Sequence, residues 1–391
     1  MNIAMFTDSY TPYVSGVVRS IQRFSRGLTT LGHKVYIFAP DYHRDMAGVP
    51  DTDATHIYRF HSVPAPTCPS FFLPIPISVR ADRLMRKLEI NIIHTHSPFL
   101  MGQLGAILAR KRDIPLLFTH HTLYHEYTHY VPVPQGFTRQ MIINYLHRYF
   151  RHCDHVITPT PQIKDLLLDL YNLPNPITPI PTGIDLSHYR GANQDWLRQQ
   201  FSIEQTSKIV LFIGRLGKEK NPIIVLEAFS LLAKQNPSIH MVFVGEGPEK
   251  EHLVQWSNEH KLKQKVHFTG SIEAQKVADC CCGADLFMFG STTETQGLVL
   301  GEAMAAGLPV VAVEATGTND IVIHGYNGYI TESEPHALAE YSHRILNNPT
   351  LYASMRVHAL RTAQQLSIDT TASQLLAVYE QALTTRFSSA R

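Results

Sequence analysis

The stretch ADLFMFGSTTETQGLVLGEAMAAGLPVVAV, residues 284–313, contains the pattern that decides the fold. An unbroken apolar run over Ala284–Phe289 predicts a buried strand, and after a polar turn a helix is expected to begin near Gly297. The helix should end at Gly307, because glycine is common just past a helix end. The next apolar run, Pro309–Val313, predicts another strand. Strand, helix and strand in this order predict a parallel sheet covered by helices.

The same alternation extends over the rest of the chain in two blocks, each with five short runs rich in β-branched or aromatic residues. Strands are expected at Met1–Thr7, Lys34–Ala39, Ile90–Thr95, Pro115–Thr119 and His155–Thr158, and then at Lys208–Ile213, Ile239–Val244, Lys265–Thr269, Ala284–Phe289 and Pro309–Val313. Helices are expected at Val17–Leu31, Gly102–Lys111 and Phe137–Arg151, and then at Pro222–Lys234, Pro248–Glu259, Glu273–Cys281 and Gly297–Ala306.

These blocks predict an α/β fold of two Rossmann-like, doubly wound domains with parallel sheets that face each other across a cleft. A length of 391 residues also favours two domains. The Pro-rich stretch Leu173–Pro181 is expected to be the linker. The expected domains are residues 1–182 and 183–367, and residues 368–391 should form a helix that packs back on the first domain.

Composition excludes several classes of protein. Hydrophobic residues make up 44% and charged residues 17%, which excludes a disordered, collagen-like or coiled-coil chain. A net charge of +1 argues against a nucleic-acid partner. Five cysteines make no disulfide framework, and neither a signal peptide nor a membrane-spanning run is expected, so we predict a cytoplasmic protein. Residues 1–185 carry an excess of basic side chains, which indicates either an anionic partner, such as a membrane surface, or scatter.

The turn and helix after Phe289 carry two carboxylates suited to binding hydroxyl groups. A helix N-terminus offers free N–H groups to a phosphate, and Gly297 lets the backbone approach closely. Glu294, just before the helix, can accept hydrogen bonds from hydroxyls beside that phosphate, and Glu302 can hold a ribose diol. The alternative is an ordinary capped helix with a solvated glutamate.

The stretch FIGRLGKEKNP, residues 212–222, follows the first strand of the second block. Arg215 and Lys220 project two cations near a strand end, where they can neutralise a pyrophosphate without a metal ion. The alternative is two solvated loop cations. The Gly turn VGEGP, residues 244–248, is a weaker signal of the same kind.

The first block carries a single glycine and several histidines at its strand ends. Gly16 follows the first strand without a G-x-G-x-x-G pattern, which argues against a dinucleotide oxidoreductase. The histidines of residues 94–96 and 120–121 follow two further strands, without the spacing of a metal site. We expect hydrogen-bonding or acid–base roles for histidines in a cleft, although His94 by itself favours a structural role.

Together these motifs resemble the retaining glycosyltransferases of family 4, which have the GT-B fold, over nearly the whole chain. The resemblance implies a first domain that binds the acceptor and a second domain that binds a nucleotide-sugar, with no required metal ion or other cofactor. The roles it implies are diphosphate binding by Arg215, Lys220 and Gly16, ribose binding by Glu302, sugar and phosphate binding by Glu294 with Thr295, Gln296, Gly297 and Leu298, and a place beside the transferred sugar for His121.

Within the family, the pieces HTHSPFLMGQLG (94–105), FTHHTLYHEYTHYVP (118–132) and ETQGL (294–298) are similar to those of bacterial diacylglycerol glucosyltransferases. This likeness implies an acceptor side with His96, Tyr127 and Tyr130. For membrane docking, the candidates are the loop 64–77 and the helix 137–151, which has apolar Phe137, Met141, Ile142, Tyr145 and Tyr149 beside Arg139, Arg148 and Arg151. Packing onto the domain core is the alternative for both.

We therefore expect an enzyme that moves a hexose, best glucose from UDP-glucose, to a lipid such as diacylglycerol, forming an α-glycosidic bond with retention. Catalysis would rest on His121, Glu294, Arg215 and Lys220, at the inner face of a membrane. The alternatives are transfer to a soluble sugar or a phosphatidylinositol-type lipid, sugar epimerisation, and a two-domain protein that binds nucleotide-sugars without turnover.

Overall fold

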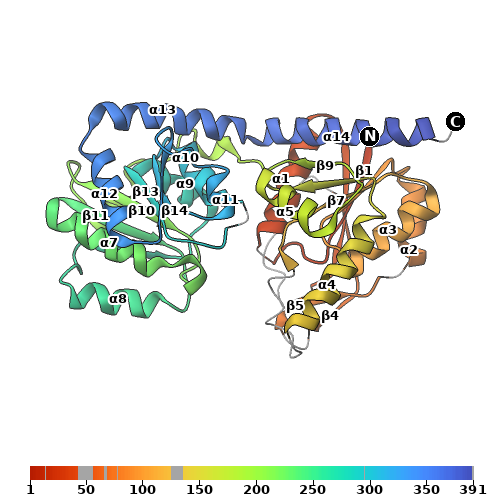
Figure 1. The fold of residues 1–391 in the computed structure, drawn as a ribbon, viewed down its shortest axis with the longest axis horizontal. Helices are drawn as coiled ribbons and strands as arrows, with labels where there is room; N and C mark the ends of the chain where they lie inside the picture. Colours follow the sequence, from red (N-terminus) through yellow and green to blue (C-terminus); the bar gives the residue numbers. More distant parts are fainter. Residues whose placement is uncertain are drawn as a thin grey trace. The chain divides into compact units, whose positions relative to one another are not determined.

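The computed structural model describes residues 1–13, 15–42, 56–65, 68–76, 78–124, 135–294 and 296–389. The chain forms two compact units, one of Met1–Gly183 with Ile368–Arg391 and the other of Ile184–Ser367. The change between the units falls one residue later than expected, after Gly183. Each unit is a parallel sheet between helices (Figure 1).

The first unit is built on a seven-stranded sheet in the order β3-β2-β1-β6-β7-β8-β9, with every pairing parallel. Its strands are β1 (Asn2–Phe6), β2 (Lys34–Pro40), β3 (His56–Phe60), β6 (Ile92–Thr95), β7 (Leu116–Thr119), β8 (His155–Thr158) and β9 (Ile177–Pro179). The expected Pro-rich linker is partly wrong, because Ile177–Pro179 pairs with β8 as the edge strand. Proline is tolerated at a sheet edge.

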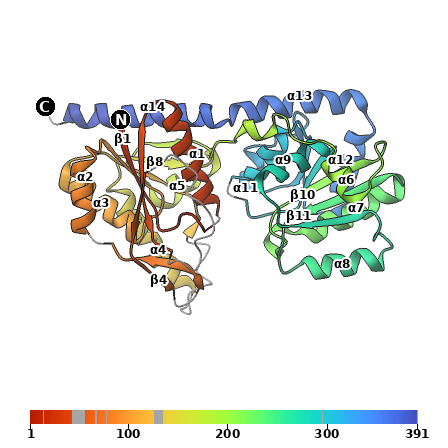
Figure 2. The same cartoon turned by 180° about the vertical axis from the view of Figure 1, so that it is seen from behind.

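Two helical layers cover this sheet, because successive side chains of each strand point to opposite faces. The helices are α1 (Gly16–Thr30), α2 (Ser78–Lys87), α3 (Leu100–Arg112), α4 (Gln135–Phe150), α5 (Pro161–Tyr171) and α14 (Ile368–Ser389). Ile3 and Met5 lie in a core with α1 and α14, whereas Ala4 and Phe6 lie in a core with α3, α4 and α5. Figure 2 shows α14 beside α1, where it contributes Tyr379 to the core.

The second unit has a six-stranded parallel sheet in the order β12-β11-β10-β13-β14-β15. The strands are β10 (Lys208–Ile213), β11 (Ile239–Val244), β12 (Val266–Gly270), β13 (Leu286–Phe289), β14 (Val310–Val313) and β15 (Gly328–Thr331). The helices are α6 (Trp196–Phe201), α7 (Pro222–Gln235), α8 (Lys250–Glu259), α9 (Ala274–Gly283), α10 (Leu298–Ala305), α11 (Thr316–Asn319), α12 (Pro335–Leu346) and α13 (Pro349–Gln365). Helix α7 packs beside α12, and α10 packs beside α13. The strand order is that of a Rossmann fold.

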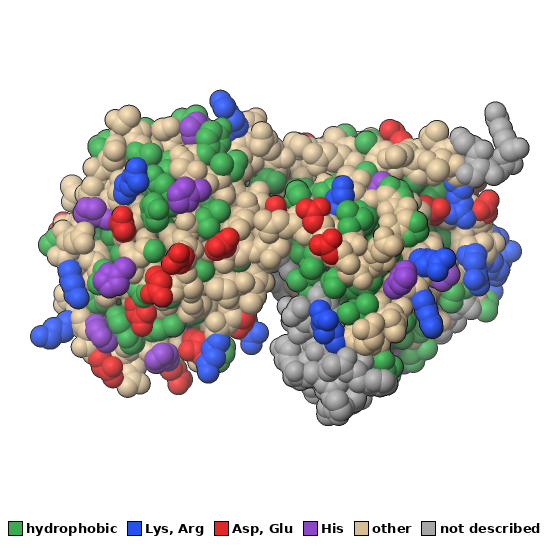
Figure 3. Space-filling view, in the orientation of Figure 1, with side chains coloured by type: hydrophobic (Ala, Val, Ile, Leu, Met, Phe, Trp, Pro, Cys, Tyr) green, Lys and Arg blue, Asp and Glu red, His purple; other side chains and the backbone are tan. Residues whose placement is uncertain are grey.

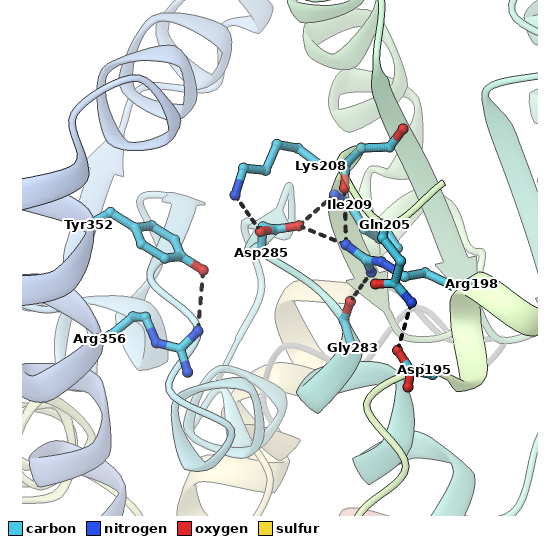
Figure 4. A network of polar contacts seen from close by, with 10 residues as sticks. Asp195, Arg198, Gln205, Lys208, Ile209, Gly283, Asp285, Tyr352 and Arg356 are labelled. Atoms are coloured by element: carbon cyan, nitrogen blue, oxygen red, sulfur yellow. Dashed lines mark hydrogen bonds and ion pairs between the residues drawn. The ribbon is translucent and has the colours of Figure 1, made fainter. Parts of the chain in front are cut away.

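A polar network joins the amino ends of β10 and β13 (Figure 4). The Asp285 carboxylate accepts hydrogen bonds of 2.9 Å from Lys208 Nζ and from the backbone N–H of Ile209. Arg198 lies 3.9 Å from the same carboxylate and donates to the backbone oxygens of Gly283 and Ser207. This network fixes the two central strands at the sheet edge opposite to their carboxyl ends.

The described residues of the stretch 64–77 lie mainly in strands, and not in the loop that was expected. Ser62–Ala65 (β4) and Cys68–Pro74 (β5) pair as a two-stranded antiparallel sheet. Prolines fit a two-stranded ribbon, because each strand has an outer edge whose residues need no N–H donor for the pairing.

Candidate functional site

In the second unit, two loops meet where the strand order reverses. β10 and β13 are the first and fourth strands of the unit, yet they are neighbours in the sheet. Ligands of open α/β sheets bind outside the carboxyl ends of the strands at this point. The hydroxyls of Ser291 and Thr293, after β13, donate to the backbone oxygen of Glu219, after β10, at 3.2 and 3.3 Å. The two loops therefore form one surface.

On this surface the structure brings together two residues predicted to bind the donor. Lys220 Nζ forms an ion pair and a hydrogen bond with Glu294 Oε1, although 74 positions separate them in the sequence. Their side chains are 26% and 12% exposed, so the contact is largely shielded from solvent. A shielded ammonium beside a shielded carboxylate offers one group for phosphate oxygens and one for sugar hydroxyls.

Arg215 extends from the same loop into solvent. Its side chain is 69% exposed, and Nη1 lies 3.8 Å from Glu219 Oε1. An exposed pair of this kind is weak, so the guanidinium is able to change partner when an anion arrives. The turn that carries Arg215 is close to the VGEGP stretch, since a Cβ on Gly245 would lie 2.1 Å from the backbone oxygen of Gly214. These glycines thus serve loop-to-loop packing, a reason the sequence did not reveal.

Helix α10 begins one residue later than expected, with Gly297 as its N-cap. Gly297 has φ = +67°, a left-handed backbone conformation that favours glycine, and a Cβ there would also lie 3.2 Å from the backbone oxygen of Gly317. Gln296 is buried and Leu298 is half-buried, and Thr295 lies outside the described residues. The loop that carries Glu294 leads into the N-terminus of α10, and a helix N-terminus is the kind of place where an anion binds.

Glu302 lies further along α10, where its side chain is buried. Its residue is 7% exposed, so a solvated surface glutamate, the alternative considered for this helix, does not describe it. The ribose contact of this buried carboxylate stays a prediction.

In the first unit, the strand order reverses between β1 and β6. Gly16 is the first residue of α1, and a Cβ there would meet nothing within 4 Å. Ser15 is the N-cap of α1, and its hydroxyl accepts a hydrogen bond of 3.3 Å from the backbone N–H of Val18. The helix therefore starts at an open, well-formed N-terminus after β1, a place where an anion can approach.

Three histidines at the ends of β6 and β7 lie together. His96 Nδ1 lies 3.0 Å from His121 Nε2, and the His96 ring also packs on the His94 ring at 4.2 Å between centroids. Burial lowers the pKa values of His94 and His121 to about 3 and holds that of His96 well below its usual range. With pKa values lowered in this way, we expect the three imidazoles to be neutral at physiological pH.

His94 and His120 have structural surroundings. Nδ1 of His94 lies 2.7 Å from the Tyr379 hydroxyl, and Nε2 of His94 lies 2.7 Å from Thr119 Oγ1. His94 therefore links β6, β7 and α14. His120 is buried against the rings of Phe118, Tyr124 and Phe150. The structural role favoured for His94 by the sequence agrees with these contacts.

Asp8, just after β1, is a buried carboxylate that sequence reasoning did not single out. Ser97 Oγ donates to Oδ2, and the backbone N–H of Met101 donates to Oδ1 at 2.7 Å. Burial is the largest influence on Asp8 and raises its pKa. Both oxygens are engaged, so Asp8 anchors the start of α3 to the loop after β1. An aspartate directly after a buried strand was the available signal.

The acceptor-side and membrane residues are only partly described. Tyr127 and Tyr130 lie outside the described residues, as does the Phe137 side chain. Tyr149 does not face solvent, because it is buried and its hydroxyl lies 2.8 Å from Thr95 Oγ1. The docking surface expected on this helix is therefore narrower than the sequence suggests, and its exposed apolar residues are Met141 and Tyr145, which are 57% and 36% exposed.

The basic neighbour of these two residues is Arg148, which is exposed on the same side of α4, whereas Arg139 lies on another side of the helix, where its charge acts on Tyr171 of α5. The patch continues onto α3, because the Phe99 ring stacks on the Tyr145 ring at 5.8 Å and is itself 41% exposed. Figure 3 shows hydrophobic and basic side chains next to one another over α4. We call Phe99, Met141, Tyr145 and Arg148 the α4 patch.

The described residues offer neither a membrane-spanning helix nor a cluster of metal ligands. None of their helices combines the length and apolar character that crossing a membrane requires. Nor do three or more of their His, Cys, Asp or Glu side chains gather in a way that could hold a metal ion.

The family follows from models that each match one unit. The model "Glycosyltransferase Family 4" matches residues 14–188, and "Glycosyl transferases group 1" matches residues 193–362. The chain belongs to the family 4 glycosyltransferases. It is thus a glycosyltransferase, and the predicted GT-B fold is confirmed.

Individual relatives agree with this assignment. The chain is 30% identical to the alpha-monoglucosyldiacylglycerol synthase of Acholeplasma laidlawii over 92% of each chain. It is 34% identical to the synthase of the same name from Streptococcus pneumoniae, over 80% of this chain and 71% of that one. Among solved structures, HepE of Anabaena in complex with UDP has a TM-score of 0.79 at 20% identity, covering 97% of this chain and 100% of that one.

Proposed function

We propose that this glycosyltransferase moves glucose from UDP-glucose to diacylglycerol and forms an α-glycosidic bond. The observation that carries the proposal is the shielded Lys220–Glu294 contact beside the N-terminus of α10, because it joins a phosphate-binding cation to a hydroxyl-binding carboxylate. Support for the donor comes from HepE, which was solved with UDP-glucose. Support for the acceptor comes from the two synthases named for monoglucosyldiacylglycerol.

In the proposed reaction, Lys220, Arg215 and the first turn of α10 stabilise the negative charge that grows on the departing diphosphate. Gly16 at the start of α1 adds backbone N–H groups to that anion, Glu302 holds the ribose, and Glu294 holds sugar hydroxyls. Preorganised groups of this kind are worth about 3–4 kcal/mol each. Because cations and helix N–H groups supply the charge, the proposal needs no metal ion.

Retention follows in this proposal from attack on the face that the diphosphate leaves. The bond from C1 of glucose to the phosphate oxygen breaks, and the bond from C1 to the acceptor oxygen forms on the same face. The acceptor proton passes to the departing phosphate oxygen, so the enzyme supplies no covalent nucleophile. His121 is neutral and lies beside the sugar as a hydrogen-bonding group.

A lipid acceptor requires the enzyme to work at a membrane surface, and the α4 patch is the surface we propose for docking. Exposed apolar rings beside an arginine suit an anionic lipid interface, where the rings enter the headgroup region and Arg148 meets phosphates. The apolar rim of β4 and β5 is a second candidate contact in the same unit.

The test is product formation with purified protein, a panel of nucleotide-sugars, and vesicles of diacylglycerol in anionic lipid, with and without EDTA. We expect glucosyldiacylglycerol from UDP-glucose, α-linked by NMR, at a rate that EDTA leaves unchanged. Transfer only to soluble sugars or to phosphatidylinositol would contradict the proposal that diacylglycerol is the acceptor. Loss of activity with EDTA would overturn metal independence, and β-linked product would overturn retention.

A further inference from the structure

The pair of His96 and His121 has a geometry that bears on which ring nitrogen of His121 meets the substrate. The two rings are inclined by 20°, their centroids are 5.3 Å apart, and the facing nitrogens are 3.0 Å apart. These values are those of two nearly coplanar imidazoles that meet edge to edge, with both nitrogens close to the line between the centroids. The contact is therefore a well-aligned N–H···N hydrogen bond, in which one ring donates and the other accepts.

The other nitrogen of His96 indicates which ring is the donor. Within the described part of the chain, Nε2 of His96 is buried and has no hydrogen-bond partner. In proteins a buried N–H without an acceptor is rarer than a buried acceptor without a donor. The single proton of a neutral His96 therefore belongs on Nδ1, where it is shared with His121. Both rings are neutral, because burial strongly lowers their pKa values.

We propose that His96 is a positioning residue that donates its Nδ1–H to Nε2 of His121 and thereby fixes His121 as the tautomer with its proton on Nδ1. His121 then presents an N–H donor, and not a bare nitrogen, on the ring atom that remains for substrate. The ligand that suits this donor is a hydroxyl oxygen of the transferred sugar. This inference rests on the proposed function for its sugar, whereas the tautomer itself is a property of the free enzyme.

The surroundings of His96 make its orientation rigid. Its ring packs on His94, which is itself held at both nitrogens by Tyr379 and Thr119. His96 follows β6 directly, and its backbone N–H donates to the backbone oxygen of Phe6 at 2.8 Å. With backbone and ring both fixed, Nδ1 is held in the direction of His121.

The first test reads the tautomer directly. In protein with 15N-labelled histidine, two-dimensional 1H–15N spectra distinguish protonated from bare ring nitrogens, and the His121 signals are those lost in a His121→Gln variant. We expect a protonated Nδ1 and a bare Nε2 in the unliganded wild-type enzyme. A proton on Nε2 of His121 would overturn the proposal whatever reaction the enzyme catalyses.

The second test uses three substitutions that differ in where they place a donor. In His96→Asn the side-chain amide takes the position of Nδ1 and can still donate to His121. In His96→Gln the amide takes the position of Nε2, and His96→Phe keeps an aromatic ring without a donor. We expect Phe and Gln to lower kcat roughly tenfold with little change in KM for UDP-glucose, which is the worth of one hydrogen bond. The His96→Asn variant should keep a kcat close to that of the wild type. Equal activity of the Asn and Gln variants would overturn the proposal.

A matched control comes from the second unit. His240 and His267 form a pair of the same geometry, with nitrogens 3.0 Å apart, centroids 5.3 Å apart and rings inclined by 17°. They lie on β11 and β12, outside the candidate site. His240→Phe should leave kcat unchanged, which separates the loss of this histidine pair from a general effect of removing one. If wild-type enzyme transfers no glucose, the proposed function fails while the NMR test still decides the tautomer.

Discussion

At the scale of single residues, the ion pair of Lys220 and Glu294 has two tasks. Without a ligand, each side chain neutralises the other in a largely shielded place. With the proposed donor bound, Lys220 contacts phosphate oxygens and Glu294 contacts sugar hydroxyls. Each charged side chain therefore has a partner both before and after the donor binds. This explains how a site rich in charge stays folded before the donor arrives.

We predict that Lys220→Ala and Glu294→Ala each lower turnover at least about a hundredfold, because each removes a preorganised contact to the transition state. Steady-state rates with UDP-glucose and lipid vesicles measure the effect. Lys218→Ala is the matched control, since Lys218 is an exposed lysine of the same short turn and should give a wild-type rate. Near-normal turnover of either site variant would contradict the assignment.

The buried histidines predict how stability depends on pH. The unfolded chain binds protons near pH 6.5, whereas folded His94 and His121 bind them only near pH 3. Their contribution to stability is therefore present above pH 6.5 and is lost as the pH falls from 6.5 toward 3, by about 1.4 kcal/mol per pH unit for each group. Urea unfolding at pH 7.5, 6.5 and 5.5 measures the slope. A free energy of unfolding that stays constant down to pH 5.5 would show that these rings are already protonated or exposed.

At the scale of elements, Asp285 joins β10 to β13 at the edge opposite to the candidate site. Asp285→Ala leaves Arg198, Lys208 and the Ile209 N–H without their shared acceptor, so we expect a loss of about 3 kcal/mol in the stability of the second unit. Urea unfolding measures this loss. The control is Asp195→Ala, an exposed aspartate that accepts from Gln205 in Figure 4 and should cost less than about 0.5 kcal/mol. Equal losses would contradict the role given to Asp285.

Helix α4 has its own prediction, on membrane binding. Met141→Glu places a charge on the α4 patch, and we expect about tenfold weaker binding to anionic vesicles in sedimentation assays. Val357→Glu on α13 is a matched control, because Val357 is also 57% exposed but belongs to the other unit. If both variants bind vesicles like the wild type, the α4 patch is not the docking surface.

The elements differ in how far the sequence could predict them. β10 and β11 are unbroken apolar runs and were predicted at their observed bounds. β3 (HIYRF), β9 (ITP) and β15 (GYIT) were missed, because edge strands are short and not uniformly apolar. Tyr149 was assigned to the wrong face of α4, since a helix with apolar residues on several sides does not reveal which side is buried.

The candidate site was predictable as a set of residues but not as a set of contacts. Glycines and charges after strands pointed to Arg215, Lys220, Glu294 and Gly297. The direct pairing of Lys220 with Glu294 depends on the sheet order that makes β10 and β13 neighbours, and the pairing of His96 with His121 depends on the register of β6 and β7. Neither order nor register can be read from local pattern.

At the scale of the whole molecule, helix α14 is an integral part of the first unit. Leu375, Val378 and Tyr379 are buried in one core with α1, and Arg386 pairs with Asp113 and Asp154. We predict that a chain cut after Ser367 loses cooperative folding of the first unit and keeps that of the second, as measured by hydrogen exchange of each unit. The full chain with Tyr379→Phe keeps the packing and should lose only about 1 kcal/mol. Full protection of the first unit in the shortened chain would contradict this role of α14.

The division of the units along the chain has a consequence for biosynthesis. A ribosome makes residues 1–183 first, but the unit they begin needs residues 368–389 to cover one face of its sheet. The second unit, made in between, has all of its residues as soon as Ser367 has emerged. Domains usually complete their folding in the order of their synthesis. In this chain the unit that starts first finishes last, and until then its half-covered sheet is the surface that a chaperone would meet.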